Sequence, residues 1–146
     1  MYKTILVPLD GSRRAEAILP HVEEAARRYE AQVVFLQVVV PTPLLMDTYA
    51  NHYELWAEAM EQATKEAEDY LVRLQGEFRA KKIPVRTETA TGPVVDAIIA
   101  AAGRNNADLI AMASHGRTGL GTVFYGSVAA GVLHRIDRPL LIIRSA

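Results

Sequence analysis

Residues 4–12 read Thr4-Ile5-Leu6-Val7-Pro8-Leu9-Asp10-Gly11-Ser12, an apolar run that stops at an Asp-Gly turn. A short, near-continuous apolar run is typical of a β-strand that is buried on both faces, as in a parallel sheet. Four more runs of strand length follow: Gln32 to Val40, Val85 to Thr89, Asp108 to Ala113 and Pro139 to Arg144. The run at Val85 alternates with the charged residues Arg86 and Glu88, which favours an edge strand with one solvated face.

Helical patterns separate these runs. Apolar residues recur at helical spacing in two sets: Ile18, Val22, Ala25 and Tyr29, and then Trp56, Met60, Ala63, Ala67, Leu71, Leu74 and Phe78. Pro20 lies inside the first set, where it either bends the helix or marks a late start. We expect a third helix from Pro93 to between Gly103 and Asn106 and a fourth from about Gly126 to Arg135. The alternation of strands and helices predicts one α/β domain over residues 1–146, an open parallel sheet with helices on both faces.

The composition excludes several classes of function. The 146 residues include 16 basic and 17 acidic ones, a net charge of −1, which argues against non-specific nucleic-acid binding. The chain has no cysteine, which excludes thiolate metal sites and thiol nucleophiles and fits a reducing compartment. The histidines at 21, 52 and 134 lack metal-ligand spacing. Because no apolar run is long enough for a signal peptide or a membrane span, we expect a cytoplasmic protein that does not associate with membranes.

The best candidate for a site lies after the first and fourth runs. In an open parallel sheet, ligands bind beyond the carboxyl ends of the strands, where the winding direction reverses. Asp10-Gly11-Ser12 follow the first run, and Ser114 to Gly121 follow the fourth, ahead of the helix at Gly126-Ser127. Glycines let the backbone approach an anion closely, and a helix N-terminus offers unpaired N–H groups. The pattern indicates a phosphate site, and a flexible connection is an equally good interpretation of it.

Motifs for catalysis are missing. Gly121 and Gly126-Ser127 have P-loop spacing but lack the lysine, which disfavours that type of phosphoryl transfer. No Gly-x-Gly-x-x-Gly follows the first run and no Gly-x-Ser-x-Gly occurs, which disfavours a dinucleotide fingerprint and a hydrolase nucleophile. His115 has no orienting carboxylate nearby in sequence, so we interpret it as a loop histidine. Asp10 and Arg117 also have structural interpretations, as a helix cap and as a solvated cation.

Seven segments carry a family resemblance: Val7-Pro8-Leu9-Asp10-Gly11-Ser12, the second run, Gly92-Pro93, Ala107-Asp108-Leu109-Ile110, Ser114-His115-Gly116-Arg117-Thr118-Gly119-Leu120, Gly126-Ser127-Val128 and Arg138-Pro139-Leu140-Leu141-Ile142-Ile143-Arg144. Together they resemble the universal stress proteins over essentially the whole chain. ATP-binding members of that family carry Gly-x-x-Gly, nine residues and then Gly-Ser or Gly-Thr. Here Gly116 and Gly126-Ser127 match, while Ala113 stands at the first glycine position. Alanine excludes a positive φ there, which lowers the expected affinity for ATP.

The resemblance implies a five-stranded parallel sheet of order 3-2-1-4-5, a Rossmann-like fold of the adenine nucleotide α-hydrolase type. It implies ATP or another adenine nucleotide as the ligand, between the loops that follow the first and fourth strands. By this resemblance, Pro8, Leu9 and Val38 border the adenine, Asp10 lies near the ribose, and Met112 and Ala113 line the ribose side. The phosphates would be held by Gly116, Arg117, Gly126, Ser127 and Val128. Any Mg²⁺ would be bound mainly by phosphate and water, because the sequence supplies no carboxylate cluster.

We therefore expect a cytoplasmic, nucleotide-binding stress-response module that binds ATP and is not primarily an enzyme. The last run, Leu140 to Arg144, would be an apolar edge strand, and pairing with the same strand of a second chain would cover it in a homodimer. One alternative is a slow ATPase in which Arg117 and Ser127 stabilise developing charge. Another is a nucleotide-free interaction module, which Ala113 favours. In that module the apolar segment Pro41 to Tyr53, a candidate lid or contact surface, would be a functional part.

Overall fold

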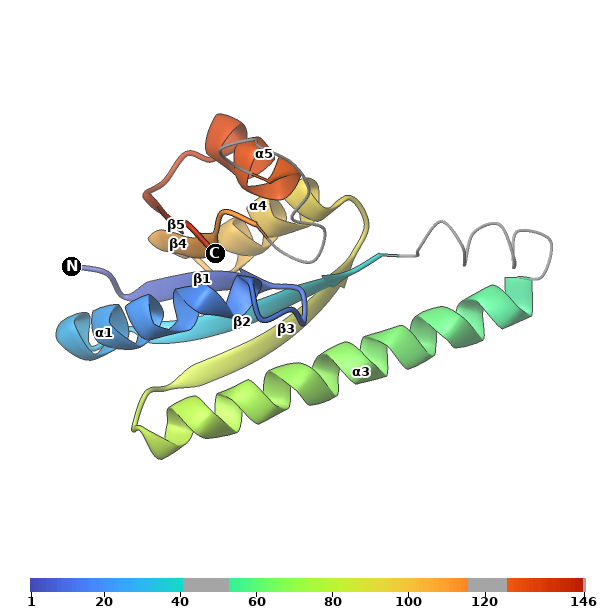
Figure 1. The fold of residues 1–146 in the computed structure, drawn as a ribbon, viewed down its shortest axis with the longest axis horizontal. Coiled ribbons are helices and arrows are strands. Elements are labelled where there is room, and N and C mark those ends of the chain that lie inside the picture. Colours follow the sequence, from blue (N-terminus) through green and yellow to red (C-terminus); the bar gives the residue numbers. More distant parts are fainter. Residues whose placement is uncertain (41–52, 116–125, 146) are drawn as a thin grey trace.

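Five parallel strands form one sheet in the computed structural model, which describes residues 1–40, 53–115 and 126–145. The strands are β1 (Thr4–Leu9), β2 (Gln32–Val39), β3 (Val85–Thr91), β4 (Leu109–Ala113) and β5 (Leu140–Ile143). Their order across the sheet is β3-β2-β1-β4-β5 (Figure 1). The predicted strand runs and the predicted sheet order are thus confirmed, with small differences at the strand ends. Of the candidate lid, Pro41 to Tyr53, residues 41–52 lie outside the described residues and Tyr53 begins α3.

Helices cover both faces of the sheet (Figure 1). Their bounds are η1, a 3₁₀ turn (Ala15–Ile18), α1 (Leu19–Tyr29), α3 (Tyr53–Ala80), α4 (Val94–Arg104) and α5 (Ser127–Arg135). The side chains of β1 alternate between the two faces of the sheet. Ile5 and Val7 pack with residues of α1 and α3, and Leu6 packs with residues of α4 and α5. This two-sided burial explains why the central strands are apolar at almost every position.

Pro20 marks the start of a helix and does not bend one. It occupies the second position of α1, which follows directly on η1. Proline is tolerated in the first turn because the N–H that it lacks would have no intrahelical partner there. Of the two interpretations that the sequence left open, the late start is correct.

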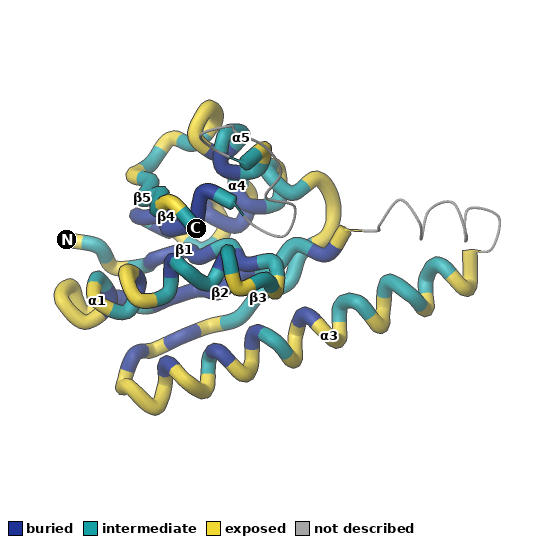
Figure 2. Tube along the Cα trace, in the orientation of Figure 1, coloured by how far each residue is buried: buried dark blue, intermediate teal, exposed yellow. Residues whose placement is uncertain are grey.

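The long helix α3 contacts the sheet with only part of its length. Its buried residues are Ala67, Leu71, Leu74 and Phe78, all in its second half, while the first half extends beyond the strands (Figure 2). The Trp56 to Phe78 stripe is therefore core only toward its end. Among the residues that the structure describes, no helix combines the length and the apolar character needed to cross a bilayer.

The amino ends of β1 and β4 are joined by a carboxylate. Asp108 lies one residue before β4, and its oxygens accept hydrogen bonds from the backbone N–H groups of Lys3 at 2.9 Å and Thr4 at 3.1 Å. The backbone N–H of Asp108 in turn donates to the Thr4 carbonyl at 3.0 Å. These contacts hold the two strands together at the end opposite to the candidate site.

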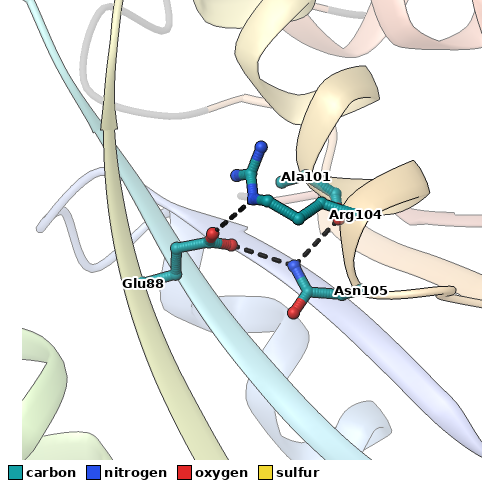
Figure 3. A network of polar contacts seen from close by, with 4 residues as sticks. All are labelled: Glu88, Ala101, Arg104 and Asn105. Carbon is teal, nitrogen blue, oxygen red and sulfur yellow. Dashed lines mark hydrogen bonds and ion pairs between the residues drawn. The ribbon is translucent and has the colours of Figure 1, made fainter.

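The edge strand β3 is tied to α4 by a polar network centred on Glu88. One carboxylate oxygen accepts a hydrogen bond from Arg104 Nε at 2.7 Å, and the other accepts from Asn105 Nδ2 at 2.9 Å (Figure 3). Asn105 Nδ2 also donates to the Ala101 carbonyl at 2.9 Å. Partial burial disfavours the charged carboxylate, but the hydrogen bonds from Arg104 and Asn105 outweigh it and hold the pKa of Glu88 below its usual 4.5.

Because the pKa of Glu88 is lower in the folded than in the unfolded chain, its stabilising contribution is present above about pH 4.5 and is lost as the pH falls through the folded value. Glu88→Gln is expected to lower the free energy of unfolding by about 0.5–1 kcal/mol at pH 7 and by less at pH 3. Urea unfolding at the two pH values measures this. Glu24→Gln removes a carboxylate whose side chain is 72% exposed and controls for the change in net charge. An equal deficit at both pH values would contradict the prediction.

Helices α4 and α5 pack closely at a glycine. A Cβ added to Gly131 would lie 2.7 Å from Val95 Cγ2, whereas a Cβ at Gly76 in α3 would meet nothing within 4 Å. We expect Gly76→Ala to stabilise the protein by about 0.5–1 kcal/mol through helix propensity. Gly131→Ala should instead be destabilising, because the overpacking against Val95 costs about 1–3 kcal/mol, which is more than the gain in helix propensity. Thermal unfolding of both variants checks the opposite signs, and equal stabilisation by both would show that the helices do not touch there.

Candidate functional site

A cleft of about 950 Å³ opens at the carboxyl ends of β1, β2 and β4, bordered also by α3 and by the start of α5. Its volume suits a small organic ligand. β1 pairs with β2 on one side and with β4 on the other, so the winding of the chain reverses beside it. This is the place where an open α/β sheet binds ligands.

The predicted site residues that the structure describes all border this cleft: Pro8, Leu9, Asp10, Val38, Met112, Ala113, Gly126, Ser127 and Val128. Gly116 and Arg117 lie outside the described residues. The loop after β1 and the start of α5, more than 100 positions apart in the sequence, are brought to the same cleft by the pairing of β1 with β4. The role of each residue toward a ligand stays a prediction.

Asp10 shapes the turn that follows β1. Its Oδ1 accepts a hydrogen bond from the Ser12 N–H at 2.9 Å, and Ser12 Oγ accepts one from the Ala15 N–H at 3.2 Å, where η1 begins. Gly11 between them has φ 86°, a left-handed conformation that favours glycine. Asp10 thus forms a turn, whereas the side chain that bonds the first N–H of η1 is that of Ser12 and not that of Asp10 as predicted. A ligand role is compatible with this turn because Asp10 also borders the cleft.

Gly126 fixes the start of α5 against the end of β4. Its N–H donates to the Ser114 carbonyl at 2.7 Å, and a Cβ at this position would lie 2.9 Å from that same oxygen. The φ of Gly126 is −66°, so space, and not a left-handed backbone, requires glycine here. No described side chain caps α5, and the N–H groups of a first helical turn have no intrahelical acceptor. The cleft thus borders donors that suit an anion.

Ala113 is an ordinary strand residue. It is buried in β4 and pairs with Ile143 of β5. It is not among the non-glycine residues with positive φ that occur in the described parts of the chain. The backbone conformation that alanine excludes is therefore not adopted here. The effect of the alanine methyl group on ATP affinity stays a prediction.

His115 lies in the loop after β4, as predicted, and is held there by hydrogen bonds. Its Nδ1 lies 3.0 Å from Ser114 Oγ, and its backbone N–H donates to Ser145 Oγ at 3.2 Å. The side chain borders the cleft, and its Nε2 is buried with no hydrogen-bond partner among the described residues. Ser114 is adjacent to His115 in the sequence, so this hydrogen-bond partner could have been predicted. Ser145 becomes a neighbour of His115 only through the pairing of β4 with β5.

Two more residues of the cleft were missed by the sequence reasoning. Gln37 of β2 borders the cleft, and its Oε1 is a buried acceptor without a partner in the described part of the chain. Tyr70 of α3 donates a hydrogen bond to Glu16 Oε2 at 2.8 Å. Burial, reinforced by Glu16, raises the pKa of Tyr70 well above its usual range, so the phenol stays neutral. In the sequence, Gln37 is part of a strand pattern and Tyr70 is part of an amphipathic helix pattern. Neither pattern indicates a ligand-binding residue.

The described side chains supply binding groups more readily than catalytic ones. No cluster of three or more Asp, Glu or His side chains that could hold a metal ion occurs within residues 1–40, 53–115 and 126–145. The serine beside His115 is only 2% exposed and is occupied by its own hydrogen bonds, so it is not placed as a nucleophile. A buried acceptor, a buried imidazole nitrogen and a helix start around one cleft suit a ligand with polar groups at separate positions.

The sequence matches the universal stress protein family over residues 1–144. Universal stress protein MJ0531 of Methanocaldococcus jannaschii is 29% identical over 144 residues, which cover 99% of this chain and 83% of that protein. The solved structure of hypothetical protein MJ0577, from the same organism, has a TM-score of 0.88 at 27% identity and covers 100% of this chain and 98% of its own. A universal stress protein solved in complex with cAMP has a TM-score of 0.64 at 23% identity, covering 99% and 98% of the two chains, a likeness of fold.

Proposed function

Because this chain belongs to the universal stress protein family, we propose that it binds an adenine nucleotide, ATP in the first place, in the cleft beside β1, β4 and α5. The observation that carries the proposal is the contact of Gly126 with Ser114, which leaves no room for a side chain at the start of α5. Such close backbone approach beside a helix N-terminus suits phosphate. A family member of the same fold has been solved with cAMP, but at 23% identity the choice of ligand for this chain rests on its own cleft.

The parts of the cleft suit different parts of the nucleotide. Pro8, Leu9, Val38 and the buried acceptor of Gln37 suit an aromatic base that carries an amino group. Asp10 and Met112 border the same cleft and suit the ribose. The phosphates would be bound by Gly126, Ser127 and Val128. Gly116 and Arg117 would add further contacts from the loop before α5. Mg²⁺ would be held mainly by phosphate and water, as no described carboxylate cluster offers a protein site.

The protein acts as a cytoplasmic binding module in this proposal, a single domain whose surface changes with nucleotide occupancy in the stress response. The absence of cysteine fits a reducing compartment. Ala113 adopts no glycine-only conformation, which removes one argument for a nucleotide-free module. A slow ATPase would rely on Arg117 and Ser127, of which Arg117 lies outside the described residues.

Nucleotide binding is tested by calorimetric titration with ATP and Mg²⁺. We expect about one ATP per chain, and we expect Gly126→Ala or Gly126→Val to weaken binding at least about tenfold, because the added carbons collide with Ser114. Gly103→Ala in α4 is the matched control, since its Cβ would meet nothing within 4 Å. Circular dichroism verifies that each variant is folded. Unchanged affinity in a folded Gly126 variant would refute the site, and no binding up to millimolar ATP would refute the function.

The second part of the proposal is a homodimer through β5. The carbonyls of Pro139 and Ile143 accept hydrogen bonds from Ile110 and Ser114, so odd-numbered residues face β4. By alternation, the backbone groups of Leu140 and Ile142 face the open edge. An apolar open edge is covered most simply by the same strand of a second chain around a two-fold axis.

Light scattering after size-exclusion chromatography is expected to give the mass of a dimer at micromolar concentration. Ile142→Pro removes an N–H that faces the open edge without removing one that faces β4, so it should give a folded monomer. Ile142→Val keeps the N–H and should remain dimeric. A monomeric wild type, or an Ile142→Pro variant that stays dimeric, would contradict pairing through β5.

A further inference from the structure

The imidazole of His115 belongs to a chain of hydrogen bonds that reaches from beyond β5 into the cleft. Ser145, two residues after β5, donates its backbone N–H to Ser114 Oγ at 3.3 Å, and Ser114 Oγ lies 3.0 Å from His115 Nδ1. Ser145 also holds the His115 backbone on both sides, because its Oγ accepts from the His115 N–H and donates to the His115 carbonyl, each at 3.2 Å. These contacts fix both the position and the surroundings of the ring.

The direction of the hydrogen bond between Ser114 and His115 sets which ring nitrogen carries the proton. Ser114 is 2% exposed, so its hydroxyl proton needs an acceptor within the protein. Ser114 Oγ already accepts from the Ser145 N–H, and His115 Nδ1 lies within hydrogen-bond distance of it among the described residues. With the Ser114 hydroxyl as the donor of this bond, Nδ1 is unprotonated. In the neutral ring the proton is on Nε2, which makes Nε2 a donor.

That nitrogen is buried and lacks an acceptor. Nε2 has no hydrogen-bond partner among the described residues. The neighbouring ring atom Cδ2 would lie 3.6 Å from a Cβ on Gly126, the residue directly before α5, so the imidazole lies beside the start of that helix. Both His115 and Ser127 border the cleft. A buried N–H without an acceptor is costly in the free protein, and a ligand oxygen would remove that cost.

We propose that His115 binds a phosphate oxygen of the nucleotide through Nε2–H, and that Ser114 and Ser145 are positioning residues that select this tautomer. The proposal rests on the proposed function for the identity of the ligand. It assigns His115 a binding role and not that of a general base, because an Nε2 that already carries a proton cannot accept another. It also connects the phosphate end of the cleft to the residues that follow the edge strand β5.

The tautomer is tested first, without any ligand. Two-bond ¹H–¹⁵N correlation spectra of the wild type should show His115 as the Nε2–H tautomer. Ser114→Ala removes the hydroxyl that selects it and should give a mixture of the two neutral forms. The Nδ1–H tautomer in the wild type, or an unchanged pattern in a folded Ser114→Ala variant, would overturn the positioning role.

The phosphate contact is tested by titrating adenosine and ADP into the wild type, His115→Phe and His115→Gln. His115→Phe keeps the shape of the ring without its donor, and His115→Gln places an amide N–H near the position of Nε2. We expect His115→Phe to weaken ADP binding about tenfold while adenosine binding stays within about twofold, and His115→Gln to restore most of the ADP affinity.

The outcomes separate this inference from the proposed function. Equal losses for adenosine and ADP in His115→Phe would show a purely structural histidine and overturn the phosphate contact. Unchanged ADP affinity in that variant would also overturn it, while nucleotide binding itself would stand. If the wild type binds neither adenosine nor ADP, the proposed function fails together with the phosphate contact, and the tautomer spectra still decide the positioning role of Ser114.

Discussion

The pairing of β1 with β2 on one side and β4 on the other is the constraint on which the rest of the structure depends. It buries β1 on both faces, which requires Ile5, Leu6 and Val7 to be apolar together. At the amino ends, Asp108 joins the two strands through the N–H groups of Lys3 and Thr4. At the carboxyl ends, the chain leaves β1 and β4 toward opposite faces of the sheet. The cleft is the space that this divergence opens.

A second close contact gives the cleft its polar character. Gly126 packs the start of α5 against the Ser114 carbonyl, to which its N–H donates a hydrogen bond. The Ser114 hydroxyl is in turn hydrogen-bonded to His115 and Ser145. The first turn of α5 offers N–H donors on this side of the cleft, and Gln37 of β2 contributes a buried acceptor from another strand. A ligand with a flat base at one end and phosphate at the other matches this asymmetry better than a uniformly polar or apolar one does.

Much of this architecture could be predicted from local patterns, and the failures have physical causes. The strands and their order followed from continuous apolar runs and from the resemblance, and Asp10 was placed at the cleft because it ends a strand. At Ala113 the motif position does not reveal the φ that the strand adopts there, which is not positive. His115 lies in a loop as predicted, but its contact with Ser145 could not be predicted because Ser145 is 30 positions away in sequence. Gln37 shows no signal at all, since an unpaired buried oxygen exists only once the fold has formed.

The central claim is that the carboxyl ends of β1 and β4, with the start of α5, form a nucleotide site. Its most direct test is an amide ¹H–¹⁵N spectrum of the labelled protein recorded during titration with ADP and Mg²⁺. The account predicts saturable shifts concentrated at Asp10, Val38, Gly126, Ser127 and Val128, with the amino ends of the strands unaffected. Saturable shifts confined to other surfaces, or no shifts at millimolar ADP, would contradict it.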